Sequence, residues 1–488
     1  MTETLADPRA ARLELLRRRR AAHSAKSTAH SAETTAHSAE TTAHSAGATA
    51  GLGTAERRMW RIHRLDQDSV SHNITLLLDV TGTTAERLVA GIETTVAGAE
   101  VLGSVIVDDD GSPRREPRPP VGRWVEPGGL WALGGGPIGE GISPADAATA
   151  LARTPFDLTR EAPVRARVYR DGTSTTAVLS FHHLAVDDTS WPVLLGAVLA
   201  GEWVRSTDAP APDHLDGARL AAAVDHARST WAAPDVRFPL SGQLPATTPE
   251  QSWLNPIDEG PGQQQRHDLD VDDLNAFTAY APSVGGTGNA ALLALTAVAV
   301  TALTGATDHV LLVPADNRRP GHAPDRVGYC GNIVPIRFTF DTGATVADAM
   351  RSAITAIYTA MEYVDVDFGP ILTALRGSGG RFPVVEIMAS VRNAPMRGVD
   401  VPAGMRVDYR SVSTGIAPYP LTLAVELAAD GGAHLEVDHQ LGTGEVIVDR
   451  AAPVVATLLH RIPTAADQPL SVLLASATAT PDNPDEAA

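Results

Sequence analysis

Helix and strand patterns alternate along this chain in two successive runs, and this alternation restricts its possible folds more than any other feature. The first run occupies residues 52–235 and the second residues 236–478, with a segment rich in Pro and Gly at 208–262 between their regular parts. Helices that alternate with strands pack as layers in which helices cover sheets. The sequence therefore predicts a mixed α/β (α+β) fold with two lobes of similar size.

The individual elements follow from local patterns. Helices are predicted from apolar residues at three- and four-residue spacing, and strands from short β-branched runs bounded by turn residues. In the N-terminal lobe the predicted helices are 54–65, 84–99, 145–152 and 191–203, and the strands are 73–80, 101–107, 164–169 and 175–181. In the C-terminal lobe the predicted helices are 272–280, 289–303, 345–363 and 449–459, and the strands are 266–270, 309–313, 333–340, 384–391, 405–412, 419–427 and 433–438.

The two ends of the chain differ in composition from the lobes. Residues 1–21 predict a short amphipathic helix, and a heptad of the type Ala-His-Ser-Ala-Glu-Thr-Thr follows, with histidines at 23, 30, 37 and 44. Regularly spaced histidines could bind a metal, but the heptad lacks the apolar positions of a coiled coil and is rich in small polar residues. We therefore expect a disordered docking helix and linker at 1–51, a disordered tail at 479–488, and no metal site.

Charge and cysteine content exclude several classes of function. The 488 residues include 39 basic and 58 acidic side chains, a net charge of −19, whereas nucleic acids and anionic membranes require a basic surface. The single cysteine, Cys330, excludes an intrachain disulfide and is predicted to be a buried thiol in a strand rather than a nucleophile. No signal peptide or apolar run of membrane-spanning length is found. We expect a cytoplasmic monomer that binds neither nucleic acid nor membrane.

A candidate site lies where a predicted strand ends on two histidines. Residues 175–181 run into His182 and His183, and residues 187–190 are good helix-start residues. An imidazole at the end of a strand, with a carboxylate four residues later, can act as a general base beside a cleft. A packed core histidine followed by a helix-capping aspartate explains the same residues equally well.

Five motifs in a fixed order resolve this choice. They are LGTAERRMW at 52–60, TPFDL at 154–158 followed by PVRA at 163–166, His-His-x-x-x-Asp at 182–187, PADNRR at 314–319 and VGYCGNIVPIR at 327–337. Together they resemble the condensation domains of nonribosomal peptide synthetases, a family of chloramphenicol-acetyltransferase-like acyltransferases, from about residue 52 to 475. The resemblance implies two lobes in a V shape with a tunnel between them. Because the sequence contains no adenylation or carrier segment, a free-standing member is expected.

The resemblance also implies a reaction. An aminoacyl or acyl group would pass from a phosphopantetheine thioester on a peptidyl or acyl carrier protein to an amine or alcohol, on a small molecule or a second carrier, in nonribosomal peptide or related antibiotic biosynthesis. The enzyme itself would bind no cofactor. His183 is the expected catalytic residue, and His182 and Asp187 are expected to support the site, Asp187 by pairing with an arginine. The candidate partners of Asp187 are Arg165, Arg318, Arg319 and Arg337.

Three further residues are expected at the substrate tunnel, namely Asp188, Trp191 and Asn332. Asn332 has a structural strand amide as its alternative role. Asp188 replaces the glycine that normally follows the motif, and either holds a cationic acceptor or caps the next helix. The family's Arg-His-Glu-x-Leu-Arg segment lacks both arginines at 98–103.

These departures leave two other functions open. A catalytically inactive homologue that recruits a carrier or synthetase would retain the fold without the reaction. Epimerisation of a carrier-bound aminoacyl group is the second possibility, because Ser190 and Trp191 resemble the corresponding residues of epimerisation domains.

Overall fold

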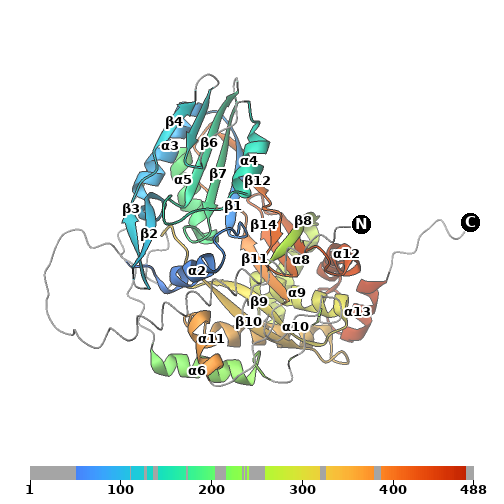
Figure 1. Ribbon diagram of the computed structural model, residues 1–488. Coiled ribbons are helices and arrows are strands. Elements are labelled where there is room, and N and C mark those ends of the chain that lie inside the picture. The colour runs from blue at the N-terminus through green and yellow to red at the C-terminus, as the bar shows by residue number, and fades with distance from the viewer. Residues whose placement is uncertain are drawn as a thin grey trace, which may run out of the picture.

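The chain folds into two lobes, each built around one β-sheet (Figure 1). The computed structural model describes residues 51–109, 111–125, 129–135, 141–171, 174–203, 216–233, 236, 239–240, 259–318, 326–377 and 386–479. The predicted docking helix, the histidine repeat and the C-terminal tail lie outside these residues, apart from Gly51 and Ala479 at their inner ends. The predicted mixed α/β class is confirmed.

The N-terminal lobe contains a six-stranded antiparallel sheet in the order β12-β1-β7-β6-β5-β4. Its elements before residue 204 are α2 (Thr54–Leu65), β1 (Asn73–Thr81), α3 (Ala85–Gly98), β2 (Ser104–Asp109), β3 (Ser112–Pro117), β4 (Gly122–Val125), β5 (Leu130–Leu133), α4 (Pro144–Ala152), β6 (Val164–Asp171), β7 (Ser174–His182) and α5 (Trp191–Ala200). Two short 3-10 helices, η1 (Glu100–Gly103) and η2 (Asp188–Ser190), precede β2 and α5. Strands β2 and β3 form a separate hairpin.

The C-terminal lobe contains a seven-stranded mixed sheet in the order β10-β9-β11-β14-β15-β8-β13. Its elements are α6 (Gly217–Ser229), β8 (Gly260–Leu269), α8 (Val271–Tyr280), α9 (Gly288–Thr304), β9 (Asp308–Asp316), β10 (Gly331–Thr339), α10 (Val346–Met361), α11 (Phe368–Gly377), β11 (Ile387–Asn393), β13 (Ile416–Ala417), β14 (Leu421–Leu427), β15 (Ala433–Gln440), α12 (Glu445–Arg461) and α13 (Leu470–Thr478). A third 3-10 helix, η3 (Ala281–Val284), joins α8 to α9. Strand β11 runs parallel to β9 and β14.

One strand crosses from the C-terminal half of the chain into the N-terminal lobe. Strand β12 (Arg406–Val412) pairs with β1 in antiparallel register from Thr75 opposite Val412 to Thr81 opposite Arg406. Val407 and Tyr409 pack against the N-terminal core. The division of the chain at residue 235 therefore stays a proposal, in which the C-terminal range supplies one edge strand to the other lobe.

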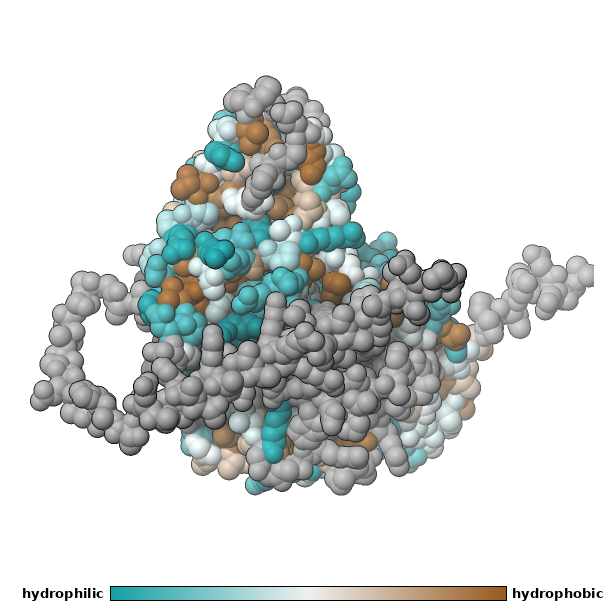
Figure 2. All heavy atoms as spheres, viewed as in Figure 1, coloured by the Kyte–Doolittle hydropathy of each residue, from teal (hydrophilic) through white to brown (hydrophobic). Residues whose placement is uncertain are grey.

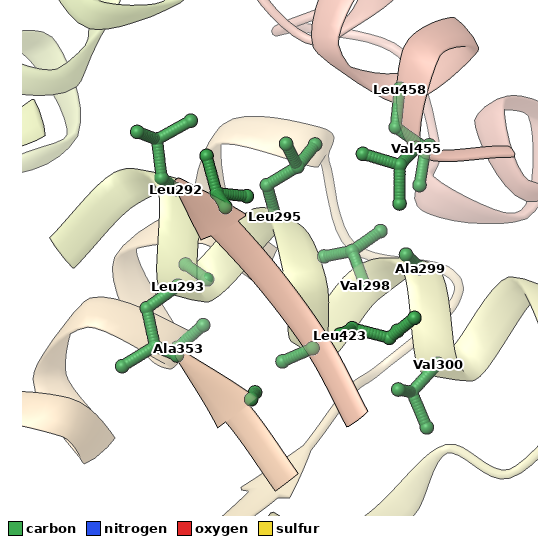
Figure 3. Packing of buried hydrophobic residues seen from close by; sticks show 14 of the residues in the cluster. Leu292, Leu293, Leu295, Val298, Ala299, Val300, Ala353, Leu423, Val455 and Leu458 are labelled. Carbon is green, nitrogen blue, oxygen red and sulfur yellow. The ribbon is translucent and has the colours of Figure 1, made fainter. Parts of the chain in front are cut away.

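Helix α9 forms the centre of the C-terminal core. Its sequence is apolar around its whole circumference, which is typical of a buried helix. Figure 3 shows its leucines and valines beside Leu423 of β14 and Val455 of α12. The helix begins where the Thr287 side chain accepts a hydrogen bond from Ala290 N–H, and it ends at Gly305 in a left-handed conformation, φ 74°.

Membrane-spanning length is not reached by any single helix in the described ranges. A bent pair made of residues 271–284 and 288–304 passes the same test of length and apolar composition. Its longer member is α9, which is buried inside the C-terminal core.

The outer surface near the junction of the lobes is polar. On the face seen in Figure 2, hydrophilic residues gather on the lower half of the N-terminal lobe, next to the C-terminal lobe. Helix α2 lies at this junction (Figure 1). Its contacts with the C-terminal lobe form part of the site described below.

Several elements were not predicted from the sequence. The predicted strand at 101–107 is wrong in its first half, because η1 occupies Glu100–Gly103 before β2 begins. Helix α6 lies inside the segment rich in Pro and Gly, and Ala223, Val224 and Ala227 pack its alanine-rich face into a small cluster with α11. Helices α11 and α13 and strands β3, β4 and β5 were also missed.

Candidate active site

The end of strand β7 fixes His183 through backbone and side-chain hydrogen bonds. Its backbone N–H donates to the carbonyl oxygen of His72 at 2.8 Å, and its Nδ1 lies 2.7 Å from the carbonyl oxygen of Val186. A carbonyl can only accept, so Nδ1 carries the proton in this bond. Nε2 of the neutral ring therefore keeps a lone pair that can accept a proton.

Asp187 pairs with Arg318, and this contact joins the two lobes. Both terminal nitrogens of Arg318 donate to the Asp187 carboxylate at 2.9 Å, in a bidentate arrangement. The same carboxylate accepts hydrogen bonds from Cys330 N–H at 2.9 Å and from the Ser190 backbone at 3.1 Å and hydroxyl at 2.9 Å. Burial alone would lower the pKa of Arg318, but the hydrogen bonds and charge of Asp187 outweigh it and raise that pKa. The loop that carries His183 is thus tied to the C-terminal lobe.

The other candidate partners of Asp187 are committed elsewhere or lie outside the described residues. Arg165 donates to the Glu161 carboxylate, at 2.5 Å for its shorter bond. Arg337 pairs with Asp308 at 2.6 Å. Arg319 falls in an undescribed range. Among the described arginines of the candidate set, only Arg318 contacts Asp187.

His182 is a packed residue behind the catalytic candidate. It is 2% exposed, and its Nδ1 accepts a hydrogen bond from Leu184 N–H at 3.1 Å. Its ring lies 5.1 Å from that of His63 and 6.1 Å from that of His72, between centroids. These contacts are those of a supporting residue, although its role stays a prediction.

The buried imidazoles are neutral at physiological pH. Burial lowers the pKa of His63 to about 4 and that of His72 to about 4, and it also lowers the pKa of His182, in which repulsion from the neighbouring imidazoles acts in the same direction. His183 is therefore backed by uncharged rings. Neither His63 nor His72 was predicted as a site residue from the sequence, although His72 lies directly before β1.

Asn332 is a structural amide. It is 2% exposed, its Nδ2 donates to the carbonyl oxygens of Val364 and Val366 at 2.8 and 2.9 Å, and its Oδ1 accepts from Phe368 N–H at 3.0 Å. Its amide is thus fully hydrogen-bonded. These contacts favour the structural alternative over a tunnel-lining role, and Asn332 fixes the loop before α11 against β10.

Arg58 of α2 connects this loop to His183 through Tyr329. Its guanidinium forms an ion pair with Asp367 and donates to the Tyr329 hydroxyl at 3.2 Å and to Gly331 O at 2.7 Å. The Tyr329 ring packs edge-on against His183, with centroids 4.9 Å apart. Arg58 belongs to the first motif and Tyr329 to the last, so the structure brings the two ends of the motif series together at His183.

Trp191 is not brought to the site. It is 3% exposed and packs in the N-terminal core, where its ring lies 5.7 Å from that of Phe181. Because an apolar residue at a helix start can face either the core or a cleft, its side of the helix could not be read from the sequence.

Asp188 lies on the surface, directly after the loop that carries His183. It is the first residue of η2, but Asp187 performs the capping role by accepting from Ser190 N–H. The Asp188 side chain is exposed to solvent, yet desolvation by the surrounding protein is the largest influence on its carboxyl and raises its pKa. The nearby positive charge of Arg392 acts in the opposite direction. Asp188 is therefore not the helix cap.

Cys330 is neither in a strand nor activated. It lies directly before β10, half-buried, and burial raises its pKa to about 11, so the thiol stays protonated. In the described part of the chain, no three His, Cys, Asp or Glu side chains are placed to hold a metal ion.

Comparison with known proteins points to one class. The solved structure of the condensation domain from the monacolin K polyketide synthase MokA superposes with a TM-score of 0.69 at 16% identity, covering 88% of this chain and 100% of that domain. The first condensation domain of the calcium-dependent antibiotic synthetase superposes with a TM-score of 0.61 at 18% identity, covering 88% and 99%. No model of a known protein family matches the chain.

A sequence relative supports the same class. A probable nonribosomal peptide synthetase, CymA from Salinispora arenicola, is 25% identical over 408 residues, which is 78% of this chain but only 5% of that synthetase. The predicted resemblance is confirmed: the chain has the condensation-domain fold. Condensation domains are acyltransferases that form amide bonds.

Proposed function

We propose that this protein is a condensation enzyme. It transfers an aminoacyl or acyl group from the phosphopantetheine thioester of a carrier protein to an amine or alcohol acceptor in natural-product biosynthesis. The observation that carries this proposal is the geometry of His183, whose Nε2 is left free by the hydrogen bond from Nδ1 to the Val186 carbonyl oxygen. Whether the enzyme acts free-standing stays a prediction.

The reaction needs one base and two bound substrates. The acceptor nitrogen or oxygen attacks the thioester carbonyl carbon, the new C–N or C–O bond forms, and the C–S bond breaks. His183 Nε2 accepts the proton that the nucleophile loses and returns a proton to the departing pantetheine sulfur. The side chain is uncharged at the start of this cycle, and it regains that state at the end. No cofactor or covalent enzyme intermediate takes part.

Asp187 and Arg318 support this reaction by positioning. Their bidentate contact crosses the junction of the lobes and holds the His183 loop against the β9–β10 connection. Correct alignment of two bound reactants can itself supply much of the rate enhancement. We therefore expect loss of His183 to leave residual turnover, and loss of the Asp187–Arg318 contact to slow turnover through misplacement of His183.

Intact-protein mass spectrometry of a loaded carrier protein tests the proposal. A carrier protein bearing an acyl-phosphopantetheine group is incubated with the full chain and a panel of amine and alcohol acceptors. We expect loss of the acyl mass from the carrier and appearance of the matching amide or ester. His183→Ala should reduce this turnover by about 10²–10⁴-fold, the usual contribution of a positioned acid–base group.

The matched control is His460→Ala. His460 lies on α12, is largely exposed and contacts Asp273, so its removal should leave turnover unchanged. Inversion of the aminoacyl centre without acyl loss would instead identify an epimerase. Carrier binding with neither outcome, across acceptors that the binding experiment below identifies, would show a recruiting homologue and refute the proposal.

A further inference from the structure

One face of the C-terminal sheet carries charged and hydroxyl side chains, whereas the opposite face packs against the hydrophobic core. Side chains alternate between the two faces of a strand. In β11, β14 and β15 the core-facing positions are hydrophobic. The other face, which we call the charged face, carries Ser390, Arg392, Thr422, Glu426, Glu436 and Asp438, with Met388, Ala424, His434 and Gln440 at its remaining positions. Strand register places Arg392 beside Glu426 and Asp438 beside Thr422.

The charged face contains more carboxylates than its arginines neutralise. Arg392 donates from Nε to Glu426 at 3.2 Å and from Nη2 to Glu436 at 2.5 Å. Arg266 of β8 adds a longer contact to Glu426, at 3.5 Å. Within the described residues, Asp438 has no ion pair or hydrogen bond. The face therefore has one carboxylate that neither arginine contacts.

Asp188 adds a second such carboxylate from the N-terminal lobe. It has no hydrogen-bond or ion-pair partner in the described part of the chain, but it is close enough for the charges of Arg392 and Glu426 to act on it. Asp188 begins η2, at the end of the short loop that carries the proposed catalytic base His183.

Ser390 adds a hydroxyl group to the charged face. It is 5% exposed and lies on the charged face, two residues before Arg392 on β11. Its hydroxyl has no hydrogen-bond partner among the described residues. The residue as a whole is nearly buried, but its hydroxyl oxygen still reaches solvent and is available to a water or to a polar group of a ligand. Ser390 can therefore bond a polar group that binds against this face.

Desolvation makes the surplus negative charge unfavourable in the unliganded protein. Burial and the neighbouring Glu436 raise the pKa of Asp438 to about 7, against the opposing effect of Arg392. The pKa of Asp188 is also raised, by desolvation first and then by Asp187 and Glu426, while Arg392 lowers it. A bound cation would relieve both effects, whereas a bound anion would add to them.

We propose that the charged face, together with Asp188, binds a protonated amine of the acceptor substrate. The acceptor would carry one nucleophilic group at His183 and a second, cationic group against Asp188, Asp438 and Ser390. This inference rests on the proposed function and narrows its acceptor to amine-bearing small molecules. Arg392 orders the face by holding Glu426 and Glu436, which leaves the other two carboxylates for the substrate.

Calorimetric titration of the full chain with α,ω-diaminoalkanes of three to six carbons tests this inference without a donor. Each diamine is compared with the amino alcohol of the same length, which lacks one ammonium group. At pH 8 we expect at least one diamine to bind about tenfold more tightly than its amino alcohol, with an advantage that shrinks as salt is added. Asp188→Asn and Asp438→Asn should each reduce diamine affinity at least fivefold, and Ser390→Ala should weaken it.

The control variant is Asp225→Asn, an exposed carboxylate on α6 that should leave diamine affinity unchanged. His183→Ala should reduce acyl transfer by about 10²–10⁴-fold and retain diamine binding, so failure of the inference and failure of the proposed function give different results. Circular dichroism confirms that each variant is folded, and Asp188→Asn and Asp438→Asn provide two separate tests. The inference is overturned if no diamine binds better than its amino alcohol, or if the matching amino carboxylic acids bind more tightly than the diamines.

Discussion

Removal of the Asp187 carboxylate should be among the most destabilising single changes in this protein. Asp187 and Arg318 are buried, with side chains 10% and 8% exposed, and their contact is bidentate. Loss of one partner of such a pair costs about 3–5 kcal/mol where the remaining charge is uncompensated, and here the contact of Arg318 Nη1 with Asp316 at 3.1 Å would offset part of that loss. Asp187→Ala would also leave Cys330 N–H and Ser190 N–H without their acceptor, at about 1 kcal/mol or more each.

Urea unfolding followed by circular dichroism measures this loss. We expect Asp187→Ala to reduce the free energy of unfolding by about 4 kcal/mol or more. The double variant Asp187→Asn/Arg318→Met removes both charges and should recover part of the loss, because no unpaired guanidinium remains. Asp225→Ala, which breaks an exposed pair with Arg228, is the matched control and should cost little.

Two results would contradict this account of the Asp187–Arg318 contact. If Asp187→Ala costs no more than Asp225→Ala, the interlobe contact does not hold the lobes together. If the double variant is as unstable as Asp187→Ala alone, the unpaired charge of Arg318 is not the source of the loss. Either outcome would also remove the physical basis for assigning Asp187 a positioning role toward His183.

Three other perturbations follow from local features. Burial raises the pKa of Glu386 to about 7. Between its ordinary pKa and pH 7 the folded state therefore holds a proton that the unfolded chain releases, so the stability of the protein falls as pH rises. In thermal unfolding, Glu386→Gln should stabilise the protein at pH 8 by on the order of 3 kcal/mol, with no gain at pH 4. Gly91→Ala would place a Cβ 2.0 Å from Val198 O and should lower the Tm sharply. The control Gly196→Ala adds a Cβ that meets nothing within 4 Å and should raise the Tm slightly through helix propensity. Equal changes in Tm for the two variants would contradict the packing of α3 on α5. Tyr329→Leu removes the ring beside His183 and should lower kcat with a smaller change in KM. Tyr329→Phe keeps the ring and should retain most of the kcat. Equal loss of kcat in both variants would assign the effect to the hydroxyl instead.

The sequence predicted those features of the candidate site that depend on neighbouring residues, but not the contacts between segments far apart in the chain. The His-His-x-x-x-Asp spacing placed His183 at a strand end, and the structure adds the carbonyl bond that leaves its Nε2 free. Choosing Arg318 over Arg165 was not possible, because the contact with Asp187 depends on how β9 is placed across the junction of the lobes. Asp188 is a similar case: its capping alternative failed only because Asp187 already performs that role.

Helices and strands were predicted most accurately where the local sequence alone, through its apolar pattern and capping residues, defines the element. Helix α9 is apolar throughout and capped at both ends, and it lies within one residue of its predicted bounds. Helix α6 is rich in alanine and has few large apolar residues, so only its packing against α11 identifies it. Strands β4 and β5 have four residues each, too short for a periodic pattern to be read.

The pairing of β1 with β12 has a consequence for how the protein is made. The two strands are separated by about 330 residues, so β1 must wait for almost the whole chain to be synthesised before its outer edge is covered. Until then the N-terminal sheet presents an unpaired apolar strand, which is a site for aggregation. A fragment that ends at residue 235 should therefore be poorly soluble alone and should be rescued by a separate C-terminal fragment that supplies β12. The crossing strand makes the N-terminal sheet complete only after residues 406–412 have been synthesised.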